Sequence, residues 1–207
     1  MTEIHLTNRL INEIQIQSSL DHPSIVKLHT FFEDSESVYL LLELCEGGEL
    51  FTHIQGPLSE EETRDLMTQL VDGVGYLHSK GIIHRDLKLG NLFLTHDKRS
   101  LKIGDFGLAA QLSSAQAERD TLCGTPNYIS PEVLMRKPYG LSSDVWSIGC
   151  ILYACLTGSP PFESKSVELT LKMIREMDFA FPPSVSDSAK ELIQSCLLYT
   201  SPSPRDS

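Results

Sequence analysis

The stretch His84-Arg85-Asp86-Leu87-Lys88-Leu89-Gly90-Asn91 is the most informative part of the sequence, and Asp105-Phe106-Gly107 follows it. Each motif alone has an ordinary interpretation, with Asp86 as a solvated turn carboxylate and Asn91 as a helix cap. Together they place an acid, a lysine, a carboxamide and a second acid on two adjacent short elements. Such a set offers oxygen ligands for a hard cation, a base for a hydroxyl proton and a cation for a phosphate. Magnesium-assisted phosphoryl transfer requires these groups.

The residues before this stretch predict a helix followed by a hairpin. Leu6, Leu10 and Ile14 recur four apart, which indicates an amphipathic helix over the first twenty residues. Two β-rich runs, 25–32 and 38–45, are separated by polar residues, as is typical of an antiparallel hairpin.

Two long helices are predicted on either side of the stretch. Ser59 and Glu62 form a capping box before a run of apolar residues at helical spacing that ends near Gly81. A second helix, which Ser143 can cap, has almost no polar face and should lie in the centre of a domain. A helix and hairpin first, with helices later, predict a two-lobed α+β fold.

Composition narrows the classes of protein. The 207 residues are 41% apolar and carry a net charge of −11 without a basic block, which argues against a nucleic-acid partner and a membrane-binding surface. No apolar run of about 18 residues and no signal peptide is present, so we expect an intracellular, cytoplasmic protein. Five cysteines without a CxxC pair indicate neither a disulfide framework nor a zinc site. The residues do not indicate an oligomeric state.

The two central motifs resemble those of the eukaryotic protein kinases. The similarity continues through Thr125-Pro126-Asn127-Tyr128-Ile129-Ser130-Pro131-Glu132 and Asp144-Val145-Trp146-Ser147-Ile148-Gly149, and it covers roughly residues 3 to 195 in order. The resemblance implies a two-lobed kinase-like α+β fold, with a helix and antiparallel strands in the small N-lobe and mainly helices in the C-lobe.

A finer resemblance points to one branch of this family. Lys88, two residues after Asp86, is typical of the serine/threonine class, and the loops 87–94 and 121–128 resemble those of the polo-like kinases. The resemblance implies transfer of the γ-phosphate of ATP to serine and threonine hydroxyls of protein substrates, with ATP and Mg²⁺ as cofactors. It also implies work in the cell cycle, at the centrosome or in the nucleus.

The same resemblance divides the chain. Residues 1–45 match a partial N-lobe with a hinge at 43–45, and residues 46–195 match a C-lobe that is incomplete at its C-terminal end. The Gly-rich loop and strand lysine that should precede Glu13 do not occur, so we expect the chain alone to be inactive. Residues 196–207 resemble the translation of a sequencing-library adapter, which predicts a non-native tail. A disordered terminus is the alternative.

The resemblance assigns catalytic roles residue by residue. Asp86 would accept the substrate hydroxyl proton and Lys88 would steady the transferred phosphoryl group, while Asn91 and Asp105 would hold Mg²⁺. Glu13 matches the glutamate that pairs with the ATP-anchoring lysine. A solvated helix glutamate is its ordinary interpretation.

Further matches concern the nucleotide. Leu42, Glu43 and Cys45 match the hinge, where main-chain groups would bind the adenine edge and Leu42 would be the gatekeeper. Phe93 would lie beneath the base. These positions are equally compatible with plain core residues.

A last group of matches concerns regulation. Thr121 lies where the family is phosphorylated, and the Arg85 guanidinium is suited to bind that phosphate. Thr125 is expected to contact the catalytic acid and lysine. Asp144 should accept hydrogen bonds from the backbone of residues 84–91, the catalytic loop, because a buried carboxylate without donors is costly.

Two other functions stay open. A non-catalytic pseudokinase or scaffold, which binds partners through its large lobe, agrees with the missing strand lysine. The retained Asp86, Asn91 and Asp105 favour an enzyme, because a scaffold needs neither a base nor metal ligands. Another serine/threonine kinase branch with the same core is the third possibility.

Overall fold

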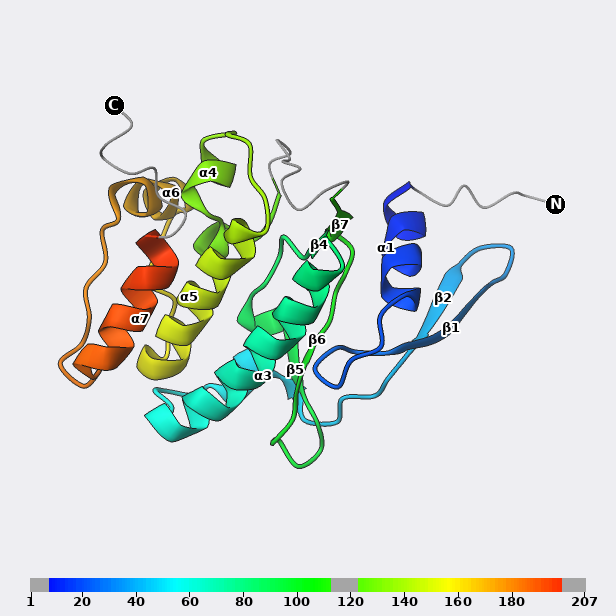
Figure 1. Cartoon of the computed structure of the whole chain (residues 1–207), viewed down its shortest axis with the longest axis horizontal. Coiled ribbons are helices and arrows are strands. Elements are labelled where there is room, and N and C mark those ends of the chain that lie inside the picture. Colours follow the sequence, from blue (N-terminus) through cyan, green and yellow to red (C-terminus); the bar gives the residue numbers. More distant parts are fainter. Residues whose placement is uncertain (1–7, 113–122, 199–207) are drawn as a thin grey trace.

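The computed structural model describes residues 8–112 and 123–198, and Figure 1 shows them in two parts. Helix α1 (Asn8–Ser18) and a two-stranded hairpin form the smaller part. The larger part is mainly helical, with α3, α5 and α7 side by side (Figure 1). The predicted two-lobed α+β arrangement is therefore confirmed.

The smaller part follows the predicted order, with shorter strands. Strands β1 (Leu28–Glu33) and β2 (Val38–Leu42) pair antiparallel. Asp34 closes the turn, because its carboxylate accepts the main-chain N–H groups of Glu36 and Ser37, each at 2.8 Å. Strand β1 starts later than predicted because Ile25 instead bridges to Ile103 in the larger part.

Helix α3 (Glu60–Ser79) begins as its sequence predicts. Ser59 Oγ accepts the Glu62 N–H at 3.2 Å, and the Glu62 carboxylate accepts the Ser59 N–H at 3.1 Å. Both halves of the capping box are formed. The short α2 (Leu50–His53) precedes it.

Helix α5 (Ser142–Thr157) is buried almost all round, as its apolar sequence predicts. The predicted Ser143 cap is wrong. Leu141 occupies the cap position, and Ser143 lies inside the first turn with its hydroxyl donating to the Gly140 carbonyl at 3.0 Å. Trp146 stacks on Phe162 at 5.5 Å in the core beside this helix. Helices α4 (Pro131–Leu134), α6 (Val167–Glu176) and α7 (Asp187–Leu198) complete the larger part.

Short strands bring the two central motifs together. A three-stranded sheet has the order β3 (Gly48–Glu49), β5 (Leu92–Leu94) and β6 (Leu101–Ile103), while β4 (Ile82–Ile83) pairs with β7 (Ala110–Gln111). All these pairs are antiparallel. Residues 84–91 run from β4 to β5 and residues 104–109 run from β6 to β7, so the pairing places both loops at the same end of these strands.

Helix α7 continues past residue 195, where we expected the native sequence to end. Leu197 is fully buried, and Cys196 is partly buried beside Gly149 of α5. Residues 199–207 lie outside the described residues, so the non-native tail stays a prediction there. None of the helices in residues 8–112 and 123–198 combines the length and apolar character needed to cross a membrane.

Candidate active site

The loop from His84 to Asn91 is anchored by one buried carboxylate. Asp144, in the first turn of α5, accepts the main-chain N–H groups of His84 and Arg85, each at 3.0 Å, and contacts His78 Nε2 at 2.9 Å. Arg85 has a left-handed backbone with φ of 69°, which is costly for a residue with a side chain. The hydrogen bonds of Asp144 hold this turn, which confirms the contact predicted for it.

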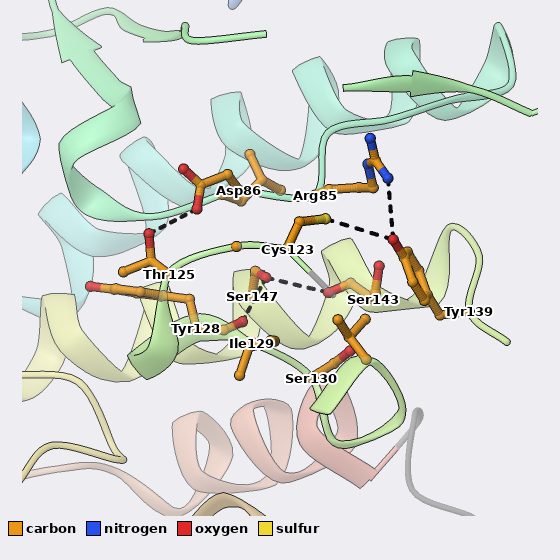
Figure 2. A pocket seen from close by; sticks show the side chains of 13 residues that line it. Arg85, Asp86, Cys123, Thr125, Tyr128, Ile129, Ser130, Tyr139, Ser143 and Ser147 are labelled. Atoms are coloured by element: carbon orange, nitrogen blue, oxygen red, sulfur yellow. Dashed lines mark hydrogen bonds between the residues drawn. The ribbon is translucent and has the colours of Figure 1, made fainter. Parts of the chain in front are cut away.

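Three side chains converge on the Asp86 carboxylate. Lys88 Nζ donates to Asp86 Oδ2 at 2.8 Å, and Thr125 Oγ1 donates to Asp86 Oδ1 at 2.8 Å. Lys88 also donates to Thr125 Oγ1 at 2.9 Å. Asn91 Nδ2 donates to Asp86 Oδ2 at 3.1 Å and to its main-chain oxygen at 2.9 Å. The predicted contacts of Thr125 are present, and Figure 2 shows its hydroxyl pointing at Asp86.

The second motif lies directly beside Asn91. The Gly104 N–H donates to the Asn91 carbonyl at 2.9 Å, so Asp105 follows a residue that is bonded to Asn91. Asp105 has φ of 59°, and its exposed carboxylate accepts the Gly107 N–H at 3.2 Å. Between them, Phe106 is fully buried and its ring lies 5.2 Å from that of His84. The two motifs therefore meet through main-chain and ring contacts.

These residues fit a magnesium ion. The Asn91 amide nitrogen is used by Asp86, which leaves the amide oxygen as the atom for a cation. Asp105 adds a carboxylate. No cluster of three or more His, Cys, Asp or Glu side chains that could hold a metal occurs in the two described ranges. Mg²⁺ needs no such cage, because it is usually held by one or two protein oxygens, waters and substrate phosphates.

Glu13 points toward this motif from α1. Burial raises the pKa of Glu13, the nearby negative charge of Asp105 raises it further, and Arg9 acts in the opposite direction. A Cβ atom on Gly107 would lie 3.2 to 3.3 Å from Arg9 Nη2, Asp105 Oδ1 and Glu13 Oε2. Glu13 therefore lies beside the Asp105 motif, and its neighbouring cation is Arg9.

At the predicted hinge, Glu43 is engaged within the protein. Its carboxylate contacts Lys102 Nζ at 2.8 Å and accepts the Lys27 N–H at 3.2 Å. Burial alone would raise the pKa of Glu43, but these hydrogen bonds lower it below its usual value. Lys102 also donates to the Pro23 carbonyl at 2.9 Å. Sequence reasoning missed Lys102, because its strand shows nothing more than a polar residue between two apolar ones.

The other residues that we predict to contact the nucleotide are Leu42, Phe93 and Cys45. Leu42, the last residue of β2, is 42% exposed, and Phe93 in β5 packs against Gly104. Cys45 is partly buried, which raises the pKa of its thiol, and the charge of Glu43 adds to this effect. Their contacts with a nucleotide stay predictions.

Of the predicted regulatory residues, Thr121 lies outside the described residues. Arg85 Nε donates to the Leu108 carbonyl at 2.6 Å, and its Nη1 donates to the Tyr139 hydroxyl at 3.3 Å. Figure 2 shows this hydrogen-bonded pair among the residues that line a small cavity of about 10 Å³, which has room for no more than a water molecule. The phosphate-binding role of Arg85 stays a prediction.

Two further side chains near the site were not predicted. Arg9 Nε donates to the Gly107 carbonyl at 2.8 Å, and Asn12 Nδ2 donates to the Ala109 carbonyl at 2.9 Å. Arg9 lies three residues before Asn12 and four before Glu13, and this spacing could have indicated both, because residues three and four apart share one face of a helix. A polar inner face on an amphipathic helix is unusual.

Comparison with known proteins agrees with this geometry. Residues 2–206 match the protein kinase domain family. Serine/threonine-protein kinase PLK4 of Danio rerio is 48% identical over 210 residues, which cover 100% of this chain and 22% of that protein. The protein of the same name from Nematostella vectensis is 51% identical over 195 residues, covering 93% of this chain and 20% of the relative. The protein of the same name from Drosophila melanogaster is 47% identical over 195 residues, which cover 93% of this chain and 25% of that protein.

The chain thus spans between 20% and 25% of the length of these curated relatives. The loop sequences resemble those of polo-like kinases, and the identity of this chain with the PLK4 relatives confirms that resemblance. The family match extends over nearly every residue and includes both loops, residues 84–91 and 104–109. The chain belongs to the protein kinase domain family.

Proposed function

We propose that the protein to which this chain belongs is a polo-like serine/threonine kinase, which transfers the γ-phosphate of ATP to hydroxyls of protein substrates. The observation that carries this proposal is the Asp86 carboxylate with Lys88, Thr125 and Asn91 as its donors. The names of the similar relatives agree with it. A scaffold has no need for such an arrangement.

The role of Asp86 follows from its neighbours. Thr125 places a hydroxyl at 2.8 Å from Asp86 Oδ1, which is the separation at which a carboxylate accepts a hydroxyl proton. We propose that a substrate serine or threonine binds beside this hydroxyl and donates its proton to Asp86. Lys88, whose ammonium lies between Asp86 and Thr125, would steady the transferred phosphoryl group.

Magnesium and nucleotide would bind on the Asn91 side of this carboxylate. Asn91 and Asp105 would hold Mg²⁺, which when bound neutralises charge on the phosphate oxygens. Glu13 and Phe93 would help to position the nucleotide, together with the hinge residues Leu42, Glu43 and Cys45. The observed hydrogen bonds fit this division, because the Asn91 amide nitrogen orients Asp86 while its oxygen stays available.

The remaining predictions belong to the same proposal. Residues 1–45 would be part of the small lobe, residues 46–195 part of the large lobe, and residues 196–207 a tail foreign to the kinase. Phosphate on Thr121 would order the segment between Asp105 and Glu132, with Arg85 as its ligand. The resemblance to polo-like kinases implies work in the cell cycle, at the centrosome or in the nucleus.

A phosphotransfer assay tests the proposal. The full-length protein that contains this chain is incubated with casein, magnesium and radiolabelled ATP, beside its Asp86→Asn variant. Loss of the base should lower the rate by about a hundredfold or more. Asp65→Asn, which alters an exposed carboxylate on α3, serves as the control. Equal rates for Asp86→Asn and the original protein would favour the scaffold.

A further inference from the structure

The main chain that follows the Asp105 motif is held by side chains from α1. Arg9 Nε donates to the Gly107 carbonyl at 2.8 Å, and Asn12 Nδ2 donates to the Ala109 carbonyl at 2.9 Å. These bonds join residues that are 98 and 97 positions apart in the sequence. Helix α1 lies against β7, into which this segment runs (Figure 1). Two side chains of one helix therefore hold alternate carbonyls of one loop.

The carbonyl between these two is held from the opposite side. Arg85, in the catalytic loop, donates from Nε to the Leu108 carbonyl at 2.6 Å. Three consecutive carbonyls, 107 to 109, are thus bound by side chains, two from α1 and one from the catalytic loop. Charged donors form two of the three bonds, and such bonds are stronger than neutral ones.

The segment needs such support because the turn before it is strained. Asp105 has φ of 59°, a left-handed conformation that a residue with a side chain adopts at a cost. Its own carboxylate supplies one local hydrogen bond, to the Gly107 N–H at 3.2 Å. A strained turn persists when its surroundings determine its conformation, and here the bonds to residues 107 to 109 provide that determination.

We propose that Arg9 and Asn12 are positioning residues, which fix the Asp105 turn against the catalytic loop by holding the Gly107 and Ala109 carbonyls. Helix α1 thereby sets where the Asp105 carboxylate lies relative to Asn91. The catalytic consequence rests on the proposed kinase function. The consequence for the order of the main chain does not, so the two can be tested separately.

Hydrogen–deuterium exchange of the 207-residue chain tests the structural step. Arg9→Gln removes the guanidinium and Asn12→Asp removes the amide donor, and each makes the net charge one unit more negative. Gln15→Glu changes the charge equally at an exposed position of the same helix and is the matched control. We expect the amides of residues 107–110 to exchange about tenfold faster in the two variants, because a stabilising bond is lost. Exchange within α1 should stay unchanged.

Two results of this experiment would overturn the inference. One is unchanged exchange at residues 107–110 in both variants. The other is equally faster exchange throughout α1, which would mean that Arg9 and Asn12 act by stabilising their own helix.

Kinetics of the full-length protein test the catalytic step. Misplacement of the Asp105 turn should lower kcat by roughly ten- to a hundredfold and raise the magnesium concentration for half-maximal activity, with the KM for the protein substrate unchanged. Arg9→Lys keeps a cationic donor and should restore part of the loss. If the original protein is active and neither variant alters its magnesium dependence, the positioning role is wrong. If it is inactive while exchange responds, the proposed function fails instead.

Discussion

At the scale of single residues, Glu132 carries a buried carboxylate that lacks hydrogen-bond donors among the described residues. Its side chain is buried, and neither carboxylate oxygen has a hydrogen-bond partner within the described part of the chain. Burial raises the pKa of Glu132 above its ordinary value of 4.5, and the nearby Glu132 main-chain N–H and Ser130 hydroxyl oppose this effect only in part. Because the carboxylate is buried and none of the described residues places a cation beside it, the ionised form is costly in this fold.

The raised pKa predicts how stability depends on pH. The folded chain holds this proton more tightly than the unfolded chain does, so the free energy of unfolding should fall as pH rises from about 4.5 through the raised pKa. Glu132→Gln cannot ionise and should be more stable than the original chain at pH 7, with no such gain at pH 4. Urea unfolding of the 207-residue chain at both values measures this.

The exposed Glu191→Gln on α7 is the control for Glu132→Gln, and we expect it to change stability little at either pH. A stability gain for Glu132→Gln that is the same at pH 4 and pH 7 would contradict the proposed cause.

At the scale of elements, the start of α5 determines the shape of the catalytic loop. The single carboxylate of Asp144, 1% exposed, accepts two main-chain N–H groups and contacts His78. The loop begins with Arg85 in a left-handed conformation, so it depends on these bonds. A helix that is apolar almost all round thus carries one acid where the loop needs an acceptor.

Replacing this acid should weaken the whole fold. In Asp144→Asn one oxygen is exchanged for an amide donor, so a main-chain N–H stays buried without an acceptor. We expect the free energy of unfolding to fall by about 2–5 kcal/mol. Denaturant titration measures the loss, and the exposed Asp65→Asn should change stability by less than about 0.5 kcal/mol. A similarly small effect for Asp144→Asn would show that the loop does not rely on this carboxylate.

At the scale of the whole molecule, the larger part is built on close packing of α3, α5 and α7 (Figure 1). Gly149 of α5 lets α7 approach, because a Cβ atom there would lie 2.8 Å from Cys196 Cβ and 3.1 Å from Leu197 Cδ2. Leu197 is fully buried at this contact. The contact therefore admits no added methyl group without movement of a helix.

A pair of glycine substitutions tests this packing. Gly149→Ala should lower the free energy of unfolding by about 1–3 kcal/mol, because the added methyl group overpacks the α5–α7 contact. Gly75→Ala on α3 is the matched control, since apart from its own helix backbone no described atom lies within 4 Å of its added Cβ. That change should instead stabilise the helix by up to about 1 kcal/mol. Thermal unfolding compares the two, and a stable Gly149→Ala variant would contradict the packing.

Much of the large lobe could be predicted from neighbouring residues alone. The capping box of Ser59 and Glu62 and the apolar sequence of α5 lie within a few turns of chain, so local hydrogen bonding and burial decide them. The catalytic loop and the Asp105 motif were recognisable for the same reason, because their side chains stand at short, fixed spacings. Local patterns were less reliable at boundaries, because Leu141 rather than Ser143 occupies the N-terminal cap position of α5.

The side chains of the candidate site and the family of the chain thus follow from short runs of sequence. The hydrogen bonds that hold the backbone of the site in place are a property of the folded chain. Arg9 and Asn12 reach carbonyls 98 and 97 positions away, and Lys102 reaches Glu43, which directly follows β2. No periodicity announces such pairs, because they depend on the path by which the chain returns to α1. Tertiary packing alone decides which polar side chains meet the backbone of the Asp105 turn.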